Sequence, residues 1–348
     1  MANESTALAM IAHLDGLTKP KGSLGKLEDY CVKLSVVQGR VPPRIGKKSV
    51  YVFAGDHGVI DEGVSLYPKD VTYQMMFNFL AGGAAINALA AGTGWEVVAV
   101  DSGVAHDFPK QEELPKAASF LDRKIGKGTR NFAKEAAMTA EELASALEAG
   151  RNLALEAARD NDLVAIGDMG IGNTTCAAAL LVASGLDAAV IVDRGTGIDD
   201  EALARKRRVV ADAVAARGPF ASPMEVMRAV GGYDLAMMTG FILGLEGTGV
   251  GCVLDGFPVT AAAYMAYKLR PSVTDYLFAG HRSRVAGHAP VLAALGLEPI
   301  VSLDMRLGEG TGAVIGGFIM ELGVKAAREM ASFAQAKVSE SSGDEKDF

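Results

Sequence analysis

Residues 163–185 read LVAIGDMGIGNTTCAAALLVASG and join three kinds of local structure in one segment. The apolar run at the start predicts a short buried strand, and the alanine- and leucine-rich run from Cys176 predicts a helix. The glycines between these two runs are typical of a tight loop that connects two elements. We therefore interpret the segment as one strand–loop–helix unit.

The same order of elements repeats along the chain. Thr139 and Glu142 add a capping-box pattern at the start of one predicted helix. Repeated strand–loop–helix units predict a parallel sheet with helices packed on it. The expected fold class is α/β, with a Rossmann-like parallel sheet and helices on both faces. Predicted strands lie within residues 47–59, 95–104, 162–168, 250–257 and 274–283, and predicted helices within residues 70–92, 139–160, 176–185, 199–218, 258–269 and a segment that ends near Leu295.

The two chain ends predict a second, smaller unit. Residues 1–45 and 325–340 are interpreted as helical flanks that form a small helical domain. Residues 46–324 are expected to form the large α/β catalytic domain. The polar segment 341–348 is expected to be disordered.

Composition argues against several classes of protein. The 348 residues carry a formal net charge of −8, which disfavours a nucleic-acid-binding surface. The three cysteines lack the spacing of a disulfide framework or a zinc site, and acids lie where a signal peptide needs a basic start. We therefore expect a cytoplasmic protein. Glu246 and Glu321 interrupt the most apolar stretches, which are interpreted as buried core and not as membrane spans.

Ligands of parallel α/β sheets bind at the carboxyl ends of the strands. Six loops of this chain are expected at that edge, and together they carry most of its unusual residues. They read GDHGV, DSGV, GDMGIGNTT, DGFPVT, AGHRS and RLGEGTG. The sequence thus predicts one site, built from loops that are far apart along the chain.

The loop GDMGIGNTT is the strongest candidate for a phosphate-binding loop. Gly170 and Gly172 allow the backbone to turn its N–H groups outward. Asn173 and Thr174 supply further donors at the start of a helix, where the dipole favours an anion. The loop matches neither GxxxxGK[ST] nor GxGxxG, so a P-loop kinase or a dinucleotide fold gains little support. A turn and helix cap without a ligand is the alternative interpretation.

Lys206 lies in a predicted helix beside three arginines, at positions 205, 207 and 208. A run of four basic residues usually forms a solvated face. Successive residues of a helix point about 100° apart, however, so one of the four can turn inward.

Two histidines follow predicted strand ends. Asp56 directly precedes His57, and Asp255 is expected at the same edge of the sheet as His281. Together these residues make a metal site conceivable. The histidines lack the close spacing of common metal motifs, so hydrogen-bonding roles in the loops are favoured. No metal is expected.

Glu309 lies between Gly308 and Gly310, just before a long apolar run. A carboxylate that is buried in such a loop has a raised pKa, which suits a general base near neutral pH. An acid at the N-terminus of a helix, where it complements the helix dipole, is an equally good interpretation of these residues.

Several of these segments resemble one enzyme family. The chain contains, in order, LTKPKGSLGKLE, FAGDHGV, YPKDVTYQM, GDMGIGNTT, VGGYDLA, LDGFPVTAAA and MRLGEGTGA. Their order and spacing are similar to those of the nicotinate-nucleotide:dimethylbenzimidazole phosphoribosyltransferases over nearly the whole chain. The resemblance implies a transfer of phosphoribose from nicotinate mononucleotide to a benzimidazole, in cobamide lower-ligand assembly. It also implies a homodimer and a reaction that needs no metal or redox cofactor.

The resemblance assigns roles to individual residues. Glu309 matches the general base of the family, and Lys206 matches its phosphate-site lysine. Asp168 stands where the family commonly has the longer glutamate, so a direct contact between Asp168 and the ligand stays open. The expected nucleotide- and phosphate-binding residues are Asp168, Gly170, Gly172, Asn173, Thr174 and Lys206.

The expected base-binding residues depart from the family pattern. Some members have a serine at the position of Tyr67 and a glutamine eight residues later, where this chain has Met75. Gln74 lies one residue earlier and is expected to face the base. Arg306 and Leu307, directly before the Glu309 loop, complete the set. The departure leaves the preferred base open among benzimidazoles, purines and phenolics.

Two other functions fit parts of the sequence less well. A non-catalytic nucleotide-binding relative would not need Glu309 together with the glycine-rich loop. An unrelated kinase or dehydrogenase would need a fingerprint that is missing from the chain.

Overall fold

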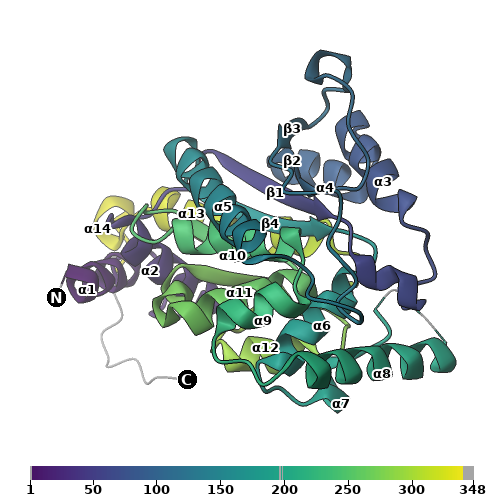
Figure 1. Ribbon diagram of the computed structural model, residues 1–348. Coiled ribbons are helices and arrows are strands. Elements are labelled where there is room, and N and C mark those ends of the chain that lie inside the picture. The colour runs from purple at the N-terminus through teal and green to yellow at the C-terminus, as the bar shows by residue number, and fades with distance from the viewer. Residues whose placement is uncertain (1, 196, 198, 340–348) are drawn as a thin grey trace.

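The computed structural model describes residues 2–195, 197 and 199–339 and shows an α/β fold (Figure 1). Its sheet has seven strands in the order β3-β2-β1-β4-β5-β6-β7, and all neighbouring pairs are parallel. This is the strand order of a Rossmann-type fold, so the predicted fold class is confirmed. The strands are β1 (Lys48–Gly55), β2 (Glu96–Gly103), β3 (Ser119–Asp122), β4 (Leu163–Met169), β5 (Gly251–Leu254), β6 (Leu277–His281) and β7 (Pro299–Val301).

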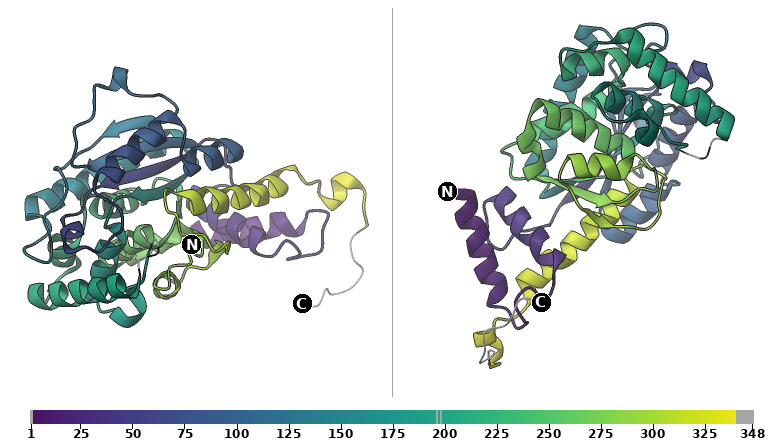
Figure 2. Two further views of the ribbon diagram at one scale, coloured as in Figure 1. Left: turned by 90° about the vertical axis from the view of Figure 1, so that its right-hand side faces the viewer. Right: turned by 90° about the horizontal axis from the view of Figure 1, so that it is seen from below.

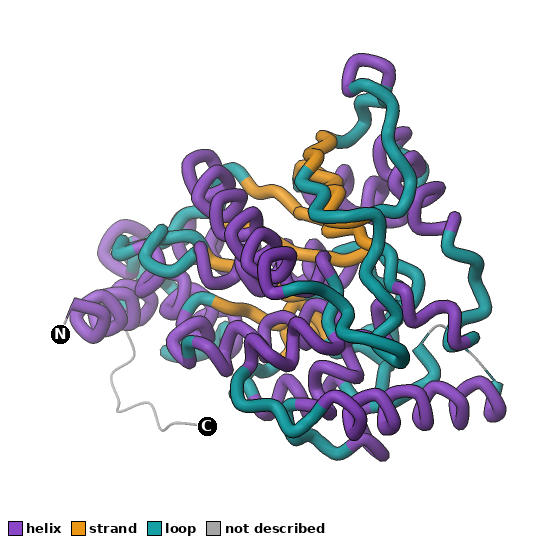
Figure 3. The backbone as a smooth tube through the Cα atoms, in the orientation of Figure 1, coloured by secondary structure: helices purple, strands orange, loops and turns teal. Residues whose placement is uncertain are grey.

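Helices cover both faces of the sheet (Figure 3). Alternate residues of a strand point to opposite faces, and accordingly Val50 and Val52 of β1 lie in one hydrophobic cluster while Tyr51 and Phe53 lie in the other. The first cluster also takes side chains from α1 (Ala2–Asp15), α2 (Lys26–Gln38), α3 (Asp70–Ala81), α4 (Ala85–Thr93) and α13 (Thr311–Glu329). The second takes side chains from α5 (Ala140–Asp160), α6 (Asn173–Ala183), α7 (Ala188–Ile191), α8 (Asp200–Arg217), α9 (Pro223–Val230), α10 (Tyr233–Gly244), α11 (Phe257–Leu269) and α12 (His288–Ala294).

The predicted helix starts agree with the observed caps. Glu142 donates its amide to Thr139 Oγ1 over 3.1 Å, and the Thr139 amide donates to Glu142 Oε2 over 2.6 Å, which completes the capping box of α5. Asp199 caps α8 by accepting the amide of Ala202 over 2.8 Å. Each cap satisfies backbone donors that the first helical turn leaves without partners.

The single helix predicted over residues 70–92 is wrong, because the chain forms α3 and α4 with a break between them. Gly82 ends α3 in the left-handed region with φ 82°, and its amide donates to the carbonyl groups of Asn78 and Phe79. A glycine in this conformation terminates a helix at little cost. Asp70–Thr93 is the one helical stretch in the described ranges with the length and mean hydropathy, 1.3, that a membrane span requires. Met76, Phe79 and Ile86 of this stretch are nevertheless buried against the sheet.

The N-terminal helices and the C-terminal part of α13 lie side by side at one end of the molecule (Figure 2). His13 Nε2 lies 2.7 Å from the carbonyl oxygen of Ala327, and Leu17 forms an antiparallel bridge with Ser332 just before α14 (Phe333–Ala336). Helix α13 runs without interruption through the boundary expected at residues 324 and 325. The division into a helical and an α/β domain therefore stays a proposal, and the tail 341–348, expected to be disordered, lies outside the described residues.

Candidate active site

A cavity of about 290 Å³ lies at the carboxyl ends of the central strands. Four of the six loops expected at this edge line it, namely those that follow β4, β5 and β6 and the loop that precedes α13. The GDHGV loop lies behind the cavity, because a Cβ at Gly170 would come within 2.9 Å of His57 Nε2. The lining residues are Tyr67, Val71, Met75, Asp168, Met169, Gly170, Ile171, Asn173, Thr174, Gly195, Gly256, Phe257, Pro258, His281, Ser283, Val285, Arg306, Leu307, Gly308 and Glu309.

The backbone around Glu309 is in the left-handed region at three successive residues. Gly308 has φ 93°, Glu309 φ 62° and Gly310 φ 87°. Such a φ is uncommon for a residue other than glycine and indicates that its surroundings hold it there. Position 310 must also be glycine for steric reasons, because a Cβ would lie 2.6 Å from Val50 Cγ2. The two glycines thus allow the chain to present one carboxylate very close to the sheet.

The Glu309 side chain is buried beside the cavity, with 5% of the residue exposed. Its Oε2 accepts a long hydrogen bond of 3.4 Å from the amide of Ile86, at the start of α4. Burial raises the pKa of Glu309, and the negative charge of Asp255 raises it further, while the Ile86 amide opposes the shift. A carboxylate with these surroundings is a stronger base than one in water.

The predicted phosphate loop forms another part of the cavity wall. Gly172, with φ 98°, precedes α6, and Thr174 donates its amide to Asn173 Oδ1 over 2.7 Å. Gly170, Asn173 and Thr174 line the cavity at the N-terminus of α6, where partial positive charge accumulates. Gly172 packs behind the loop instead, against His57.

Lys206 is the member of its basic run that turns inward. It is 2% exposed, and its Nζ donates a hydrogen bond of 2.9 Å to Thr174 Oγ1. Burial lowers the pKa of Lys206 to about 8, although Asp193 opposes this shift. Arg208 of the same run is exposed, so the solvated-face interpretation holds for that residue and not for Lys206.

Asp168 lies near the end of β4 and lines the cavity. It is 3% exposed, and its carboxylate accepts a hydrogen bond from Asn173 Nδ2. Burial raises the pKa of Asp168 to about 8, and the charges of Asp234 and Asp255 add to the effect. Burial and these charges therefore favour the protonated form of this carboxyl group.

Four of the five expected base-binding residues line the cavity: Tyr67, Met75, Arg306 and Leu307. Gln74 is not among the described residues that line the cavity, and the Gln74 residue is exposed. Met75 lies four residues after Val71 and shares its helical face, whereas Gln74 falls on the neighbouring surface of α3. The structure thus does not support the expectation that Gln74 faces the base.

The chain is similar to known proteins in both sequence and fold. A profile of a family described as phosphoribosyltransferase matches residues 1–338. The nicotinate-nucleotide–dimethylbenzimidazole phosphoribosyltransferases of Geobacter metallireducens and Thermus thermophilus are 47% and 49% identical over 330 residues, which is 94% of this chain and 92% and 96% of theirs. The crystal structure of CobT from Thermus thermophilus matches with a TM-score of 0.91 and 46% identity, over 97% of this chain and 100% of that one.

The chain belongs to this family of phosphoribosyltransferases. The resemblance drawn from its sequence motifs is confirmed, as are its fold class and its classification as a transferase.

Two residues of this phosphoribosyltransferase have contacts that the sequence did not reveal. Asp255, considered above only as a metal ligand, accepts backbone hydrogen bonds from the start of α13. His281 lines the cavity and is 2% exposed. The only sequence signal for either residue was its place in a loop at the carboxyl end of a strand.

His57 is buried behind the phosphate loop of the transferase. Its Nδ1 lies 3.1 Å from Cys176 Sγ, and its Nε2 lies 3.2 Å from Asp234 Oδ2. Burial disfavours the charged imidazole, but Asp234 and Cys176 together outweigh it and raise the pKa of His57 well above its usual value. The raised pKa favours the imidazolium form, whose charge is paired with the Asp234 carboxylate.

Proposed function

We propose that the chain transfers the 5-phosphoribosyl group of nicotinate mononucleotide to 5,6-dimethylbenzimidazole or a related base. The products are α-ribazole 5′-phosphate and nicotinate, and the reaction belongs to the assembly of the cobalamin nucleotide loop. The names of the relatives specify the donor and the acceptor. The observation that carries the proposal is one cavity that holds both a buried carboxylate, Glu309, and a glycine-rich loop backed by Lys206.

The reaction needs one base and no acid on the leaving group. The glycosidic bond of nicotinate mononucleotide joins the ribose to a pyridinium nitrogen, so nicotinate leaves with the electron pair of that bond and without protonation. The acceptor, in contrast, loses its N–H proton as its other ring nitrogen attacks the anomeric carbon. We assign this proton to Glu309, whose burial and neighbouring charge favour proton uptake. Attack on the face opposite the leaving group gives the α configuration.

The phosphate end of the nucleotide has a positively polarised site, formed by the N-terminus of α6 and Lys206. We place the phosphate at the N-terminus of α6, against Gly170, Asn173 and Thr174. Lys206 supports this position from behind through its hydrogen bond to Thr174 Oγ1. An anion in this place would keep Lys206 protonated, because opposite charge favours the charged form.

The acceptor end is mainly apolar. Tyr67, Val71, Met75 and Leu307 line the cavity beside Glu309 and offer flat or flexible apolar surface to an aromatic ring. The glycines that flank Glu309 would let such a ring approach the backbone next to the carboxylate. Because Tyr67 and Met75 replace polar residues of some relatives, another benzimidazole, a purine or a phenolic is the alternative acceptor.

The resemblance also supports two proposals about the context of the enzyme. We propose a homodimer, the form implied by the family, and a cytoplasmic location, which agrees with the spacing of the cysteines. Sedimentation of the purified protein at several concentrations measures the first, and fractionation of cells that produce a tagged chain measures the second.

The proposed function is tested by a turnover assay with nicotinate mononucleotide and a panel of bases. We expect nicotinate release that depends on the added base and falls about 10²- to 10⁴-fold in Glu309→Gln. Full activity of Glu309→Gln would exclude the general-base role. Nucleotide binding without turnover of any base would favour a non-catalytic relative.

A further inference from the structure

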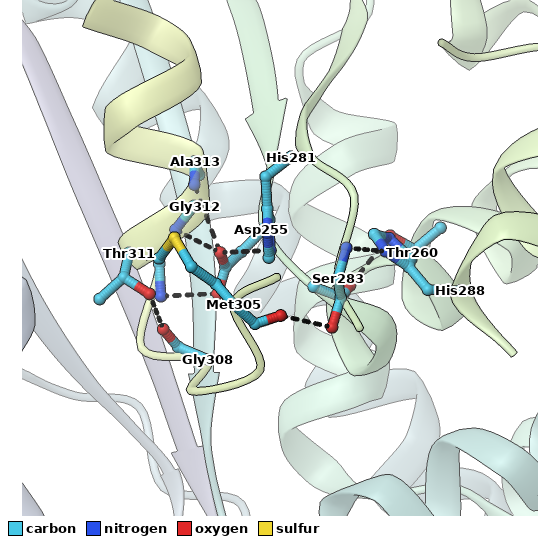
Figure 4. Close-up of polar contacts among 12 residues, drawn as sticks. Asp255, Thr260, His281, Ser283, His288, Met305, Gly308, Thr311, Gly312 and Ala313 are labelled. Carbon is cyan, nitrogen blue, oxygen red and sulfur yellow. Dashed lines mark hydrogen bonds and ion pairs between the residues drawn. The ribbon is translucent and has the colours of Figure 1, made fainter. Parts of the chain in front are cut away.

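Asp255 lies between β5 and α11 and is 1% exposed. Its Oδ2 accepts the amide of Gly310 over 2.9 Å, and its Oδ1 accepts the amides of Gly312 over 2.8 Å and Ala313 over 3.3 Å (Figure 4). One carboxylate therefore satisfies three of the backbone donors at the start of α13. The amide of Gly310 belongs to the residue directly after Glu309.

This contact replaces an ordinary helix cap. The first amides of a helix need acceptors, which a side chain at the preceding residue usually provides. In α13 that residue is Gly310, which has no side chain and makes no side-chain cap. Glycine is required there by its positive φ and by the close approach of Val50. The acceptor must then come from another part of the chain, and Asp255 supplies it.

His281 of β6 closes the other side of this arrangement. Its Nε2 lies 3.4 Å from Asp255 Oδ1. Its ring packs closely on the first turn of α13, because a Cβ at position 312 would lie only 2.0 Å from His281 Cδ2. The Asp255 carboxylate is thus held between a ring and a helix start.

We propose that Asp255 is a positioning residue that holds the Gly308–Gly310 loop in its left-handed conformation and thereby aims Glu309 at the acceptor base. The inference rests on the proposed function, in which Glu309 takes the proton of the acceptor. Asp255 is not among the described residues that line the cavity, so it acts through the loop and not by touching the substrate.

Asp255 also acts on Glu309 through its charge. After burial, the negative charge of Asp255 is the second cause that raises the pKa of Glu309. The other titratable or charged groups near the loop are Asp168 on β4, His281 on β6 and Arg306 on the loop itself. An amide at position 255 removes the charge and one of the two acceptor oxygens while it keeps the size of the side chain.

The test compares Asp255→Asn with Asp255→Glu in steady-state kinetics over a range of pH. For Asp255→Asn we expect kcat to fall about 10- to 100-fold, because a base displaced by about 1 Å loses up to about 10²-fold in rate. The KM for nicotinate mononucleotide should change less than about twofold. The acidic limb, which is the low-pH range where kcat falls as Glu309 takes up a proton, should move to lower pH in Asp255→Asn, because the charge that raises the pKa of Glu309 is removed. It should stay in place in Asp255→Glu, which keeps the charge.

Asp187→Asn is the matched control, since Asp187 caps the short helix α7 by accepting the amide of Ala189 over 2.9 Å. It should leave kcat, KM and the acidic limb unchanged. Thermal unfolding of each variant identifies chains that do not fold. If Asp255→Asn does not fold, Asp255→Glu carries the test: its longer side chain should displace the loop and lower kcat while the acidic limb stays in place, and an unchanged kcat would overturn the inference.

Three results would overturn the inference. All three concern Asp255→Asn. They are a kcat and an acidic limb equal to those of the wild type, a higher KM for nicotinate mononucleotide with unchanged kcat, and a lower kcat with an acidic limb that does not move. In each case Glu309→Gln separates the inference from the proposed function. If Glu309→Gln loses activity, only the role of Asp255 fails; if it keeps full activity, the role of Glu309 as base fails.

Discussion

The backbone amide of Glu309 donates a hydrogen bond of 3.3 Å to the carbonyl oxygen of Asp168. The loop that carries the candidate base is therefore fixed to the strand that leads into the phosphate loop. Gly167, one residue earlier on β4, touches the same loop, because a Cβ there would lie 2.2 Å from the amide nitrogen of Gly310. A change at the end of β4 should consequently disturb both halves of the active site.

Gly167→Ala is expected to lower both stability and kcat. The added methyl group would overlap the backbone of Gly310, so either β4 or the Glu309 loop must shift. Overpacking of this kind costs about 1–3 kcal/mol of unfolding free energy. Denaturant unfolding and a turnover assay measure the two effects. Gly92→Ala is the control, since position 92 is an exposed helical site with open space around it. The control should gain up to about 1 kcal/mol and keep its kcat.

The pH dependence of kcat should report the protonation of Glu309. A general base works in its deprotonated form, so kcat falls as the pH drops through the pKa of the group. Burial, followed by Asp255, raises the pKa of Glu309 above its usual value of 4.5. The acidic limb should therefore lie above pH 4.5 when kcat is measured with both substrates saturating. A limb at or below that pH would show that a different group controls the rate.

Much of the fold was predictable because its signals are local. The apolar run and glycines of residues 163–185 predict β4, its loop and α6 without knowledge of any distant contact. The edge strands β3 and β7 were missed, since segments of three or four residues give too little periodicity. Helix α10 was missed as a helix because it is buried almost all round and shows no polar face.

The site was predictable in its residue types and less so in its contacts. Lys206 carries the same positive charge as its three arginine neighbours, and only the packing of α8 on the phosphate loop turns it inward. Asp255 and Gly310 are 55 residues apart, so no local pattern links them. Gln74 and Met75 are adjacent residues of α3, and only the packing of that helix decides which of them lines the cavity.

Lys206→Met should weaken nucleotide binding more than it slows catalysis. Methionine keeps most of the buried volume of the side chain but removes its charge and its hydrogen bond to Thr174. Loss of the Lys206 charge removes its attraction for the bound phosphate; a charge-assisted interaction of about 1.5–3 kcal/mol corresponds to a rise of about 10- to 150-fold in the KM for nicotinate mononucleotide. Initial rates at varied nucleotide concentration measure it. Arg208→Ala, at an exposed position of the same helix, should leave this KM unchanged. Equal effects in both variants would place Lys206 outside the phosphate site.

Tyr67→Ala should raise the KM for the acceptor base and leave the KM for the nucleotide unchanged. Tyr67 lines the cavity although 49% of it is exposed, so its ring can cover one side of a bound aromatic base. A contact between two aromatic rings adds about 0.5–1.5 kcal/mol, which corresponds to a rise of about 2- to 12-fold in the acceptor KM. Gln74→Ala is the matched comparison: because Gln74 is exposed and is not among the described residues that line the cavity, this change should alter neither KM. A higher acceptor KM in Gln74→Ala alone would restore Gln74 as the residue that faces the base and remove Tyr67 from that role.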